Sequence, residues 1–155
     1  RIATTGNNFV PSTDADATSG SWTVSNQVTI FDATADGQVE PVSVLGNLGK
    51  PGERIYAVRF TGAIGYVVTF VNTDPLYKLD LSDPENPVVL GELYEEGVSD
   101  YLHDINDDLL LGVGRQADVN DYGFTVFTGV KVALYDVSGD EPVNLEPFLV
   151  PGEYS

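Results

Sequence analysis

The 155-residue sequence contains no cysteine, and only seven lysine and arginine residues stand against 24 aspartate and glutamate residues. Without cysteine there is no disulfide, no thiol nucleophile and no thiolate metal site. The formal net charge of −17 argues against nucleic acid as a partner, because basic residues are needed to neutralise phosphate. The charge suits a salty or extracellular setting, where ions screen like-charge repulsion. An acidic surface kept for solubility is the simpler interpretation.

Long apolar runs and helical patterning are also missing. No stretch of 18 apolar residues exists, so we expect no membrane insertion. No segment of helical length repeats apolar residues at spacings of three and four. The chain opens at Arg1 without a signal-peptide pattern, so we expect any export signal to lie outside it. These absences indicate an all-β protein, which we place in an extracellular, cell-surface or periplasmic location.

The clearest β pattern runs from Arg54 to Leu93. Its four strand-like segments are residues 55–60, 64–70, 76–81 and 88–93. The segment IGYVVTF is almost continuously apolar, which predicts a strand buried on both faces. Gly62 supplies the turn before it, and a turn rich in serine, aspartate and proline precedes the last segment. The pattern predicts four antiparallel strands in one sheet.

Parts of this unit recur along the chain. Leu45-Gly46-Asn47-Leu48 matches Leu90-Gly91-Glu92-Leu93, 45 positions later. Asp32, Asp80 and Asp136 occupy the same position in successive repeat units. This indicates that they cap turns rather than catalyse a reaction. A period in the forties with four strands per unit is typical of a β-propeller.

The repeat predicts a single propeller-like domain over residues 1–155, with two to three four-stranded antiparallel blades in an incomplete ring. We expect a partial blade without its innermost strand, two full blades, and the start of the next, over residues 1–49, 50–95, 96–150 and 151–155. Residues 6–21 and 116–123 are rich in polar and small residues and are predicted to be loops. The stretches 6–21 and 115–127 are the expected contact surface.

The runs PGERIYAVRF, GYVVTF, DPLYKLDLSDPENPVVLGEL and VKVALYDVS, in this order, resemble the β-propeller domain of secreted bacterial and archaeal proteins that carry such a domain at their C-terminal end. The resemblance covers most of the chain. It implies a propeller fold, export and no established catalytic activity, and it carries no catalytic motif onto these residues. The sequence departs from the family by being short.

Four aromatic or imidazole residues are candidate binding residues: Trp22, His103, Tyr122 and Phe124. Trp22 adjoins the first polar stretch, and an exposed indole can form a binding platform. Tyr122 and Phe124 lie in an insertion beyond the repeat period, and inserted loops often carry function. His103, the single histidine, is predicted to line an inner strand. A structural role for each is the alternative, since aromatic residues also pack between blades.

Acidic loops suggest a calcium site, with Asp14, Asp16, Asp118 and Asn120 as candidate ligands. Oxygen side chains at alternating positions suit Ca²⁺. The bidentate glutamate that an EF-hand needs at position twelve is absent, because Ser25 and Gly129 stand there. Turns are rich in aspartate for conformational reasons alone. We therefore expect no cofactor, with Ca²⁺ as the alternative.

The sequence favours a secreted or surface-exposed scaffold that binds a protein or a carbohydrate, with no identifiable catalytic residue. The alternative is an extracellular carbohydrate-acting hydrolase or lyase that uses carboxylates at the channel mouth. The outer faces of the first and last sheets of an open arc would be apolar. We therefore expect self-association through these faces.

Overall fold

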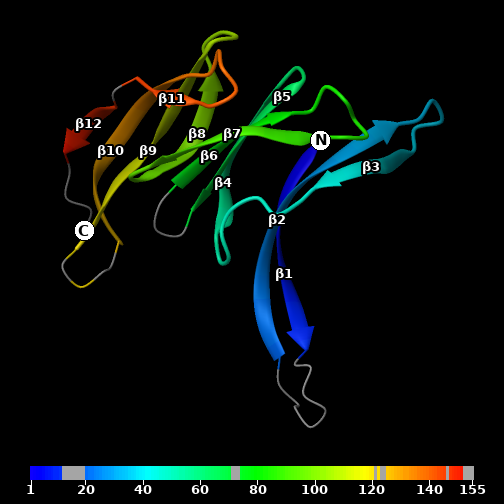
Figure 1. The fold of residues 1–155 in the computed structure, drawn as a ribbon, viewed down its shortest axis with the longest axis horizontal. Coiled ribbons are helices and arrows are strands. Elements are labelled where there is room, and N and C mark those ends of the chain that lie inside the picture. The colour runs from blue at the N-terminus through cyan, green and yellow to red at the C-terminus, as the bar shows by residue number, and fades with distance from the viewer. Residues whose placement is uncertain (12–19, 71–73, 121, 123–124, 146, 152–155) are drawn as a thin grey trace.

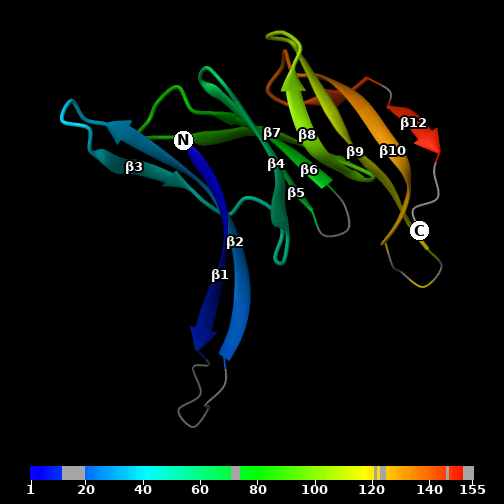
Figure 2. The same ribbon diagram turned by 180° about the vertical axis from the view of Figure 1, so that it is seen from behind.

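The computed structural model of the chain describes residues 1–155 except 12–19, 71–73, 121, 123–124, 146 and 152–155. The described residues form twelve β-strands and no helix. The strands make three antiparallel sheets that follow the chain order and form an open arc (Figures 1 and 2). The all-β prediction and the prediction of an incomplete propeller are confirmed. Among the described residues no helix is long and apolar enough to cross a membrane.

The first sheet has the order β1-β2-β3. Its strands are β1 (Ile2–Pro11), β2 (Gly20–Ala33) and β3 (Val39–Leu45). Only the second half of β2 pairs with β3, from Val28 opposite Leu45 to Ala33 opposite Val39. The first half of β2 pairs with β1 alone, so these two strands extend beyond the sheet as a ribbon.

The middle sheet has the order β4-β5-β6-β7. Its strands are β4 (Arg54–Thr61), β5 (Ile64–Phe70), β6 (Asp74–Asp80) and β7 (Val88–Glu95). Residues 65–70 of β5 are all buried, which confirms the predicted strand with two buried faces. Gly62 has a φ of 55° in the turn before β5, as the sequence predicts.

The last sheet has the order β11-β10-β9-β8, and β12 also pairs with β10. Its strands are β8 (Val98–Asp104), β9 (Leu109–Val119), β10 (Thr125–Asp136), β11 (Val143–Asn144) and β12 (Phe148–Pro151). The single strand predicted over residues 143–150 is wrong in detail. Two short pieces take its place along one edge of β10, interrupted around Pro147.

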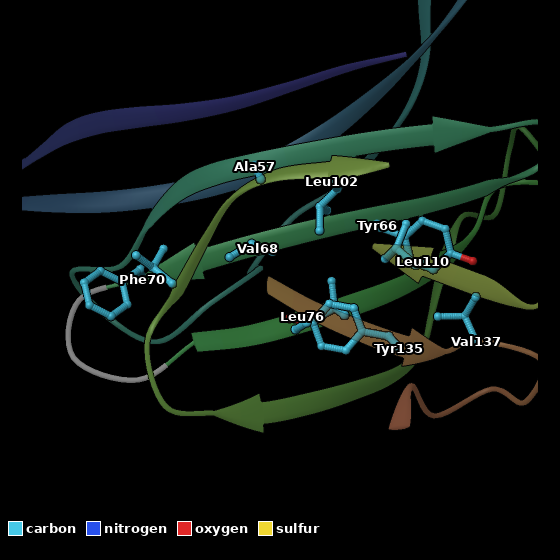
Figure 3. Close-up of a cluster of buried hydrophobic side chains, with 11 residues drawn as sticks. Ala57, Tyr66, Val68, Phe70, Leu76, Leu102, Leu110, Tyr135 and Val137 are labelled. Atoms are coloured by element: carbon cyan, nitrogen blue, oxygen red, sulfur yellow. The ribbon is translucent and has the colours of Figure 1, made fainter. Parts of the chain in front are cut away.

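Two apolar cores separate the sheets. One core lies between the middle and last sheets and includes Tyr66, Val68 and Tyr135 (Figure 3). The other lies between the first and middle sheets and includes Val28, Val67 and Leu79. Because side chains alternate along a strand, Val67 of β5 faces one core while its neighbours face the other. The middle sheet is therefore covered on both faces.

Backbone geometry supports the repeat. Gly52 and Gly97, 45 positions apart, both have a φ of 93° in the connections that lead into β4 and β8. Asp80 and Asp136 each accept a hydrogen bond from the amide two residues ahead, at 2.8 and 2.9 Å, which confirms two of the three predicted turn caps. Asp32 makes no such bond. In its turn the Thr34 amide instead donates to the Gln38 carbonyl at 2.9 Å.

Candidate functional site

The ribbon formed by residues 6–11 and 20–25, which we call the first arm, projects from the sheets (Figure 1). The sequence predicts a loop over residues 6–21. That prediction is wrong for residues 6–11 and 20–21, which are strand. Polar residues form the ribbon here because they bond across it: Asn8 Nδ2 donates to Ser25 Oγ at 2.9 Å. Arg54 of the middle sheet also donates to Asn7 Oδ1 at 2.9 Å, which fixes the base of the arm.

An aromatic pair lies near the end of the first arm. Phe9 and Trp22 face each other across the ribbon with ring centroids 5.4 Å apart. A Cβ on Gly20 would lie 2.6 Å from the Val10 carbonyl oxygen and would also meet the Phe9 ring, so only glycine fits beneath this pair. Trp22 is 72% exposed and Phe9 is 49% exposed. The candidate Trp22 is therefore an ordered and accessible indole.

A second arm is formed by residues 116–119 of β9 and 125–128 of β10. The sequence predicts a loop over residues 116–123, which is wrong for residues 116–119 because they continue β9. Phe127 fixes the base of the arm: its ring lies 6.1 Å from Phe70 of the middle sheet and 4.2 Å from the Arg115 guanidinium. Tyr122 is 84% exposed. Phe124 lies outside the described residues.

Both arms point to the same side of the molecule (Figures 1 and 2). This follows from the repeat, because each arm joins the second and third strands of a blade. β8 ends at the opposite side, so the structure separates His103 from Trp22 and Tyr122. His103 is exposed at the edge strand of the last sheet, where its ring stacks on Tyr101 at 6.2 Å.

The calcium candidates fall in two places. Asp14 and Asp16 lie outside the described residues. Asp118 is exposed near the end of β9, and Asn120 Oδ1 accepts a hydrogen bond from the Tyr122 amide at 3.0 Å, which is an ordinary turn contact. The described part of the chain holds no group of three or more histidine or acidic residues arranged for a metal ion. Calcium binding stays a prediction.

Sequence reasoning missed the buried charged residues between the middle and last sheets. Lys78 of β6 is 7% exposed, and its Nζ donates to the carbonyl oxygens of Val137 and Gly139, each at 2.7 Å. Lys131 of β10 is 1% exposed and pairs with Glu95 of β7 at 2.8 Å. The sequence did carry a signal for Lys78. It holds the repeat position of Ile30 and Leu134, which are both apolar, and this indicates a buried site.

Several cationic side chains of the chain are paired with groups of the same chain. The guanidinium of Arg115 pairs with Asp100 at 3.0 Å, and that of Arg59 pairs with Asp104. Lys50 lies 4.6 Å above the Tyr94 ring. Two turn aspartates are stabilised in their charged form: the Ser82 hydroxyl lowers the pKa of Asp80, and Asn86 lowers the pKa of Asp83. The surface is therefore strongly acidic, with few cations directed at solvent.

Comparison with known proteins supports the architecture. The family model described as a β-propeller domain matches residues 1–152. An uncharacterised protein of Archaeoglobus fulgidus is 46% identical over 101 residues, which are 64% of this chain and 15% of that protein. An uncharacterised protein of Methanocaldococcus jannaschii is 40% identical over 121 residues, 78% of this chain and 18% of that protein. The chain thus spans less than a fifth of these relatives, and the repeat, the stacked sheets and the family match agree that it belongs to the β-propeller domain family.

Proposed function

We propose that this propeller domain is a binding scaffold whose contact surface is the side that carries the two arms. The observation that carries the proposal is the exposed Phe9–Trp22 pair on an ordered ribbon that extends beyond the packed sheets. Tyr122 adds a third exposed aromatic ring on the same side. Tryptophan and tyrosine are enriched at protein interfaces, and they also stack on sugar rings.

The arms are fixed before any partner arrives. Arg54 holds the first arm at its base, and Phe127 holds the second against the middle sheet. A surface ordered in advance loses less conformational entropy on binding. The aromatic residues near the arm ends are not part of either core, so their side chains contribute little to packing between the sheets.

The test uses Trp22, the single tryptophan, whose emission reports on the first arm alone. A random peptide display library is selected on the wild-type chain and then counter-selected on a Trp22→Ser/Tyr122→Ser double variant. In parallel, a panel of soluble hexasaccharides is titrated into both proteins by calorimetry, and Trp22 emission is recorded in the wild type to show whether a sugar contacts the first arm. Ligands that bind the wild type and lose at least about tenfold in affinity on the double variant support the proposal.

The matched control is Tyr101→Ser, because Tyr101 is 54% exposed but lies on the last sheet away from the arms. Ligands that bind the wild type and the double variant equally would overturn the proposal, as would a loss of the same size in the control. Enrichment of peptides rather than a response to sugars would assign a protein partner.

The rival function is an extracellular carbohydrate-acting hydrolase or lyase. Glycoside cleavage requires one carboxyl group with a raised pKa to act as general acid. Among the described carboxyl groups, each one whose pKa departs clearly from its ordinary value has a lowered pKa: Asp36, Asp80, Asp83, Asp104 and Asp136. These five aspartates are stabilised as charged carboxylates, so none of them suits the role of general acid.

The proposal places the scaffold outside the cytoplasm, in line with the net charge of −17 and the resemblance to secreted proteins. Detection of the natural gene product in the extracellular or surface fraction of its host, trimmed at its N-terminus, would support this location. Recovery in the cytoplasm alone would contradict it.

The proposal also includes self-association through the outer faces of the end sheets. Val44 of the first sheet is 54% exposed, and Phe148 and Val150 of the last sheet are 68% and 45% exposed. Apolar side chains on a sheet face favour contact with a second copy. Light scattering should give a discrete oligomer, and Phe148→Ser should lower its mass. A monomer at all concentrations would contradict self-association.

A further inference from the structure

A groove of about 980 Å³ lies between the first and middle sheets, at the opposite end of β2 from the arm. Its apolar part is formed by Ile30, Phe31, Val42 and Phe60. The connection over residues 81–87, which joins β6 to β7, forms the facing wall. Two turn caps and a hydrogen bond from Ser43 Oγ to the Pro84 carbonyl oxygen, 2.6 Å long, hold this wall in place.

The rim of the groove is acidic. Asp32, Asp83 and Glu85 line it. The Asp83 carboxylate accepts a hydrogen bond from the Glu85 amide at 3.0 Å, whereas the side chains of Asp32 and Glu85 have no hydrogen-bond or ion-pair partner among the described residues. Arg1 also lines the groove, but its guanidinium donates to the carbonyl oxygens of Gly62 and Leu81. The rim therefore carries three carboxylates against one guanidinium, which is already directed at backbone carbonyl groups.

The equivalent place between the middle and last sheets already holds an ammonium group. Lys78 occupies there the repeat position that Ile30 occupies at the groove, and its Nζ donates to Val137 and Gly139. In the repeat these two residues correspond to Leu81 and Asp83 of the groove wall. The fold thus accepts a lysine side chain at this repeat position. The aliphatic stem of Lys78 lies among apolar groups, and its ammonium group lies at the connection that follows β10.

We propose that the groove binds a lysine side chain of a partner polypeptide. The apolar lining suits the four-carbon stem, and the rim carboxylates suit the ammonium group. Among the described residues no three acidic or histidine side chains are arranged to hold a metal ion, and a bare ion would leave the apolar lining unused, so a basic side chain fits the groove better than a cation alone. The site faces away from the arms, so it is separate from the scaffold surface proposed above.

The test uses the whole chain and a capped pentapeptide with a central lysine flanked by leucines. Its affinity is measured by calorimetry in about 50 mM salt, where screening is weak. The same peptide with acetyl-lysine keeps the stem but loses the charge. We expect the acetylated peptide to bind about tenfold more weakly.

Two sets of variants locate the site. Asp32→Asn/Glu85→Gln should weaken the lysine peptide about tenfold. Glu141→Gln is the matched control, because Glu141 is exposed at the repeat position of Glu85 in the next blade, where Lys78 is already present. Ile30→Lys should abolish binding by supplying the ammonium from within, whereas Ile30→Met should not.

The proposal is overturned by equal affinity for the two peptides, or by no binding up to about 5 mM, which corresponds to about 3 kcal/mol. Equal weakening by Glu141→Gln would also overturn it, because the effect would then come from the overall acidic field. The rim variants are surface substitutions, so they test the proposal even if Ile30→Lys fails to fold.

Discussion

The two interfaces between sheets use different chemistry for the same packing problem. The interface between the middle and last sheets is fixed by cations: Lys78 donates to two carbonyl groups, Lys131 pairs with Glu95, and Arg59 pairs with Asp104. Glu95 also accepts hydrogen bonds from Tyr135 and Asn144. The connections are reciprocal, because each sheet sends one buried lysine to the other. Buried charges of this kind require exact partners, so they define one arrangement of the two sheets.

The interface between the first and middle sheets has no buried cation among the described residues. Arg1 and Arg54 bond across it at its exposed rim, and the buried carboxyl group of Glu53 has neutral partners. The Asn26 amide donates to the carbonyl oxygens of Leu48 and Glu53, each at 2.9 Å, and Thr69 donates to Glu53 Oε2 at 2.6 Å. Ile30 replaces the lysine of the other interface, and a groove remains beside it. The comparison shows that one repeat position can hold a buried lysine that bonds the next sheet or an apolar residue beside an open groove.

The largest effect is expected at the buried ion pair. Lys131→Met leaves Glu95 buried without its cation and should lower the free energy of unfolding by about 3–5 kcal/mol. Urea denaturation measures this loss. The matched control is Lys50→Met, whose ammonium group is exposed above Tyr94 and should cost under about 1 kcal/mol. Equal losses would show that burial does not distinguish these lysines.

The interface between the first and middle sheets should respond less, because it has no buried cation among the described residues. Asn26→Ala removes the donors for two buried carbonyl groups and should lower the free energy of unfolding by about 2–3 kcal/mol. Asn8→Ala on the first arm removes one exposed bond and serves as the control. If Asn26→Ala cost more than Lys131→Met in the same denaturation experiment, the bonds of the first interface would contribute more to stability than the buried ion pair of the second.

Salt should separate the exposed ion pair from the buried one. Arg59 and Asp104 have side chains that are 39% and 28% exposed, so ions can screen their attraction. Arg59→Gln should destabilise the chain slightly in dilute buffer and have no effect in about 1 M sodium chloride. The loss caused by Lys131→Met should persist at both salt concentrations. If Arg59→Gln still destabilised the chain at high salt, Arg59 would act through packing rather than through its charge.

Acid should act on the turn caps beside both interfaces, with the smallest effect. The hydroxyls of Ser82 and Ser138 lower the pKa of Asp80 and Asp136 in the folded chain. A lowered folded pKa gives stability that is present above the unfolded pKa of about 3.9 and is lost as the pH falls through the folded value. The stability of Asp80→Ala/Asp136→Ala should therefore fall less steeply below about pH 4 than that of the wild type. If stability fell equally steeply with pH in the wild type and the double variant, the predicted contribution of the two caps would be wrong.

The repeat made the blade architecture predictable. The strand over residues 55–60, the apolar run of 64–70 and the turn at Gly62 are indicated directly, because backbone propensity and burial agree there. The strict alternation of residues 55–60 is wrong, because a bulge between Ile55 and Ala57 places Ile55 on the same face as Val58 and Phe60. The first arm was missed for the opposite reason. Its sequence is rich in glycine, asparagine and serine, which favour turns, yet cross-strand bonds and the Phe9–Trp22 pair hold it extended.

The buried cations could not be predicted from strand alternation. In LYKLDL the pattern places Lys78 on the face opposite Leu79, which in a sheet with one covered face would be solvent. The middle sheet is covered on both faces, so each side of the strand is interior. Which carbonyl groups receive Lys78 depends on the connection after β10, some sixty residues later in the chain.

The two buried lysines also make the last interface chemically observable. The chain has three lysines, and Lys78 and Lys131 both lie between the middle and last sheets, whereas Lys50 is exposed. An amine-reactive reagent at low dose should modify Lys50 and the terminal amine first. Modification of the other two then requires the sheets to separate, so its rate measures how often this pair of blades opens in the folded protein.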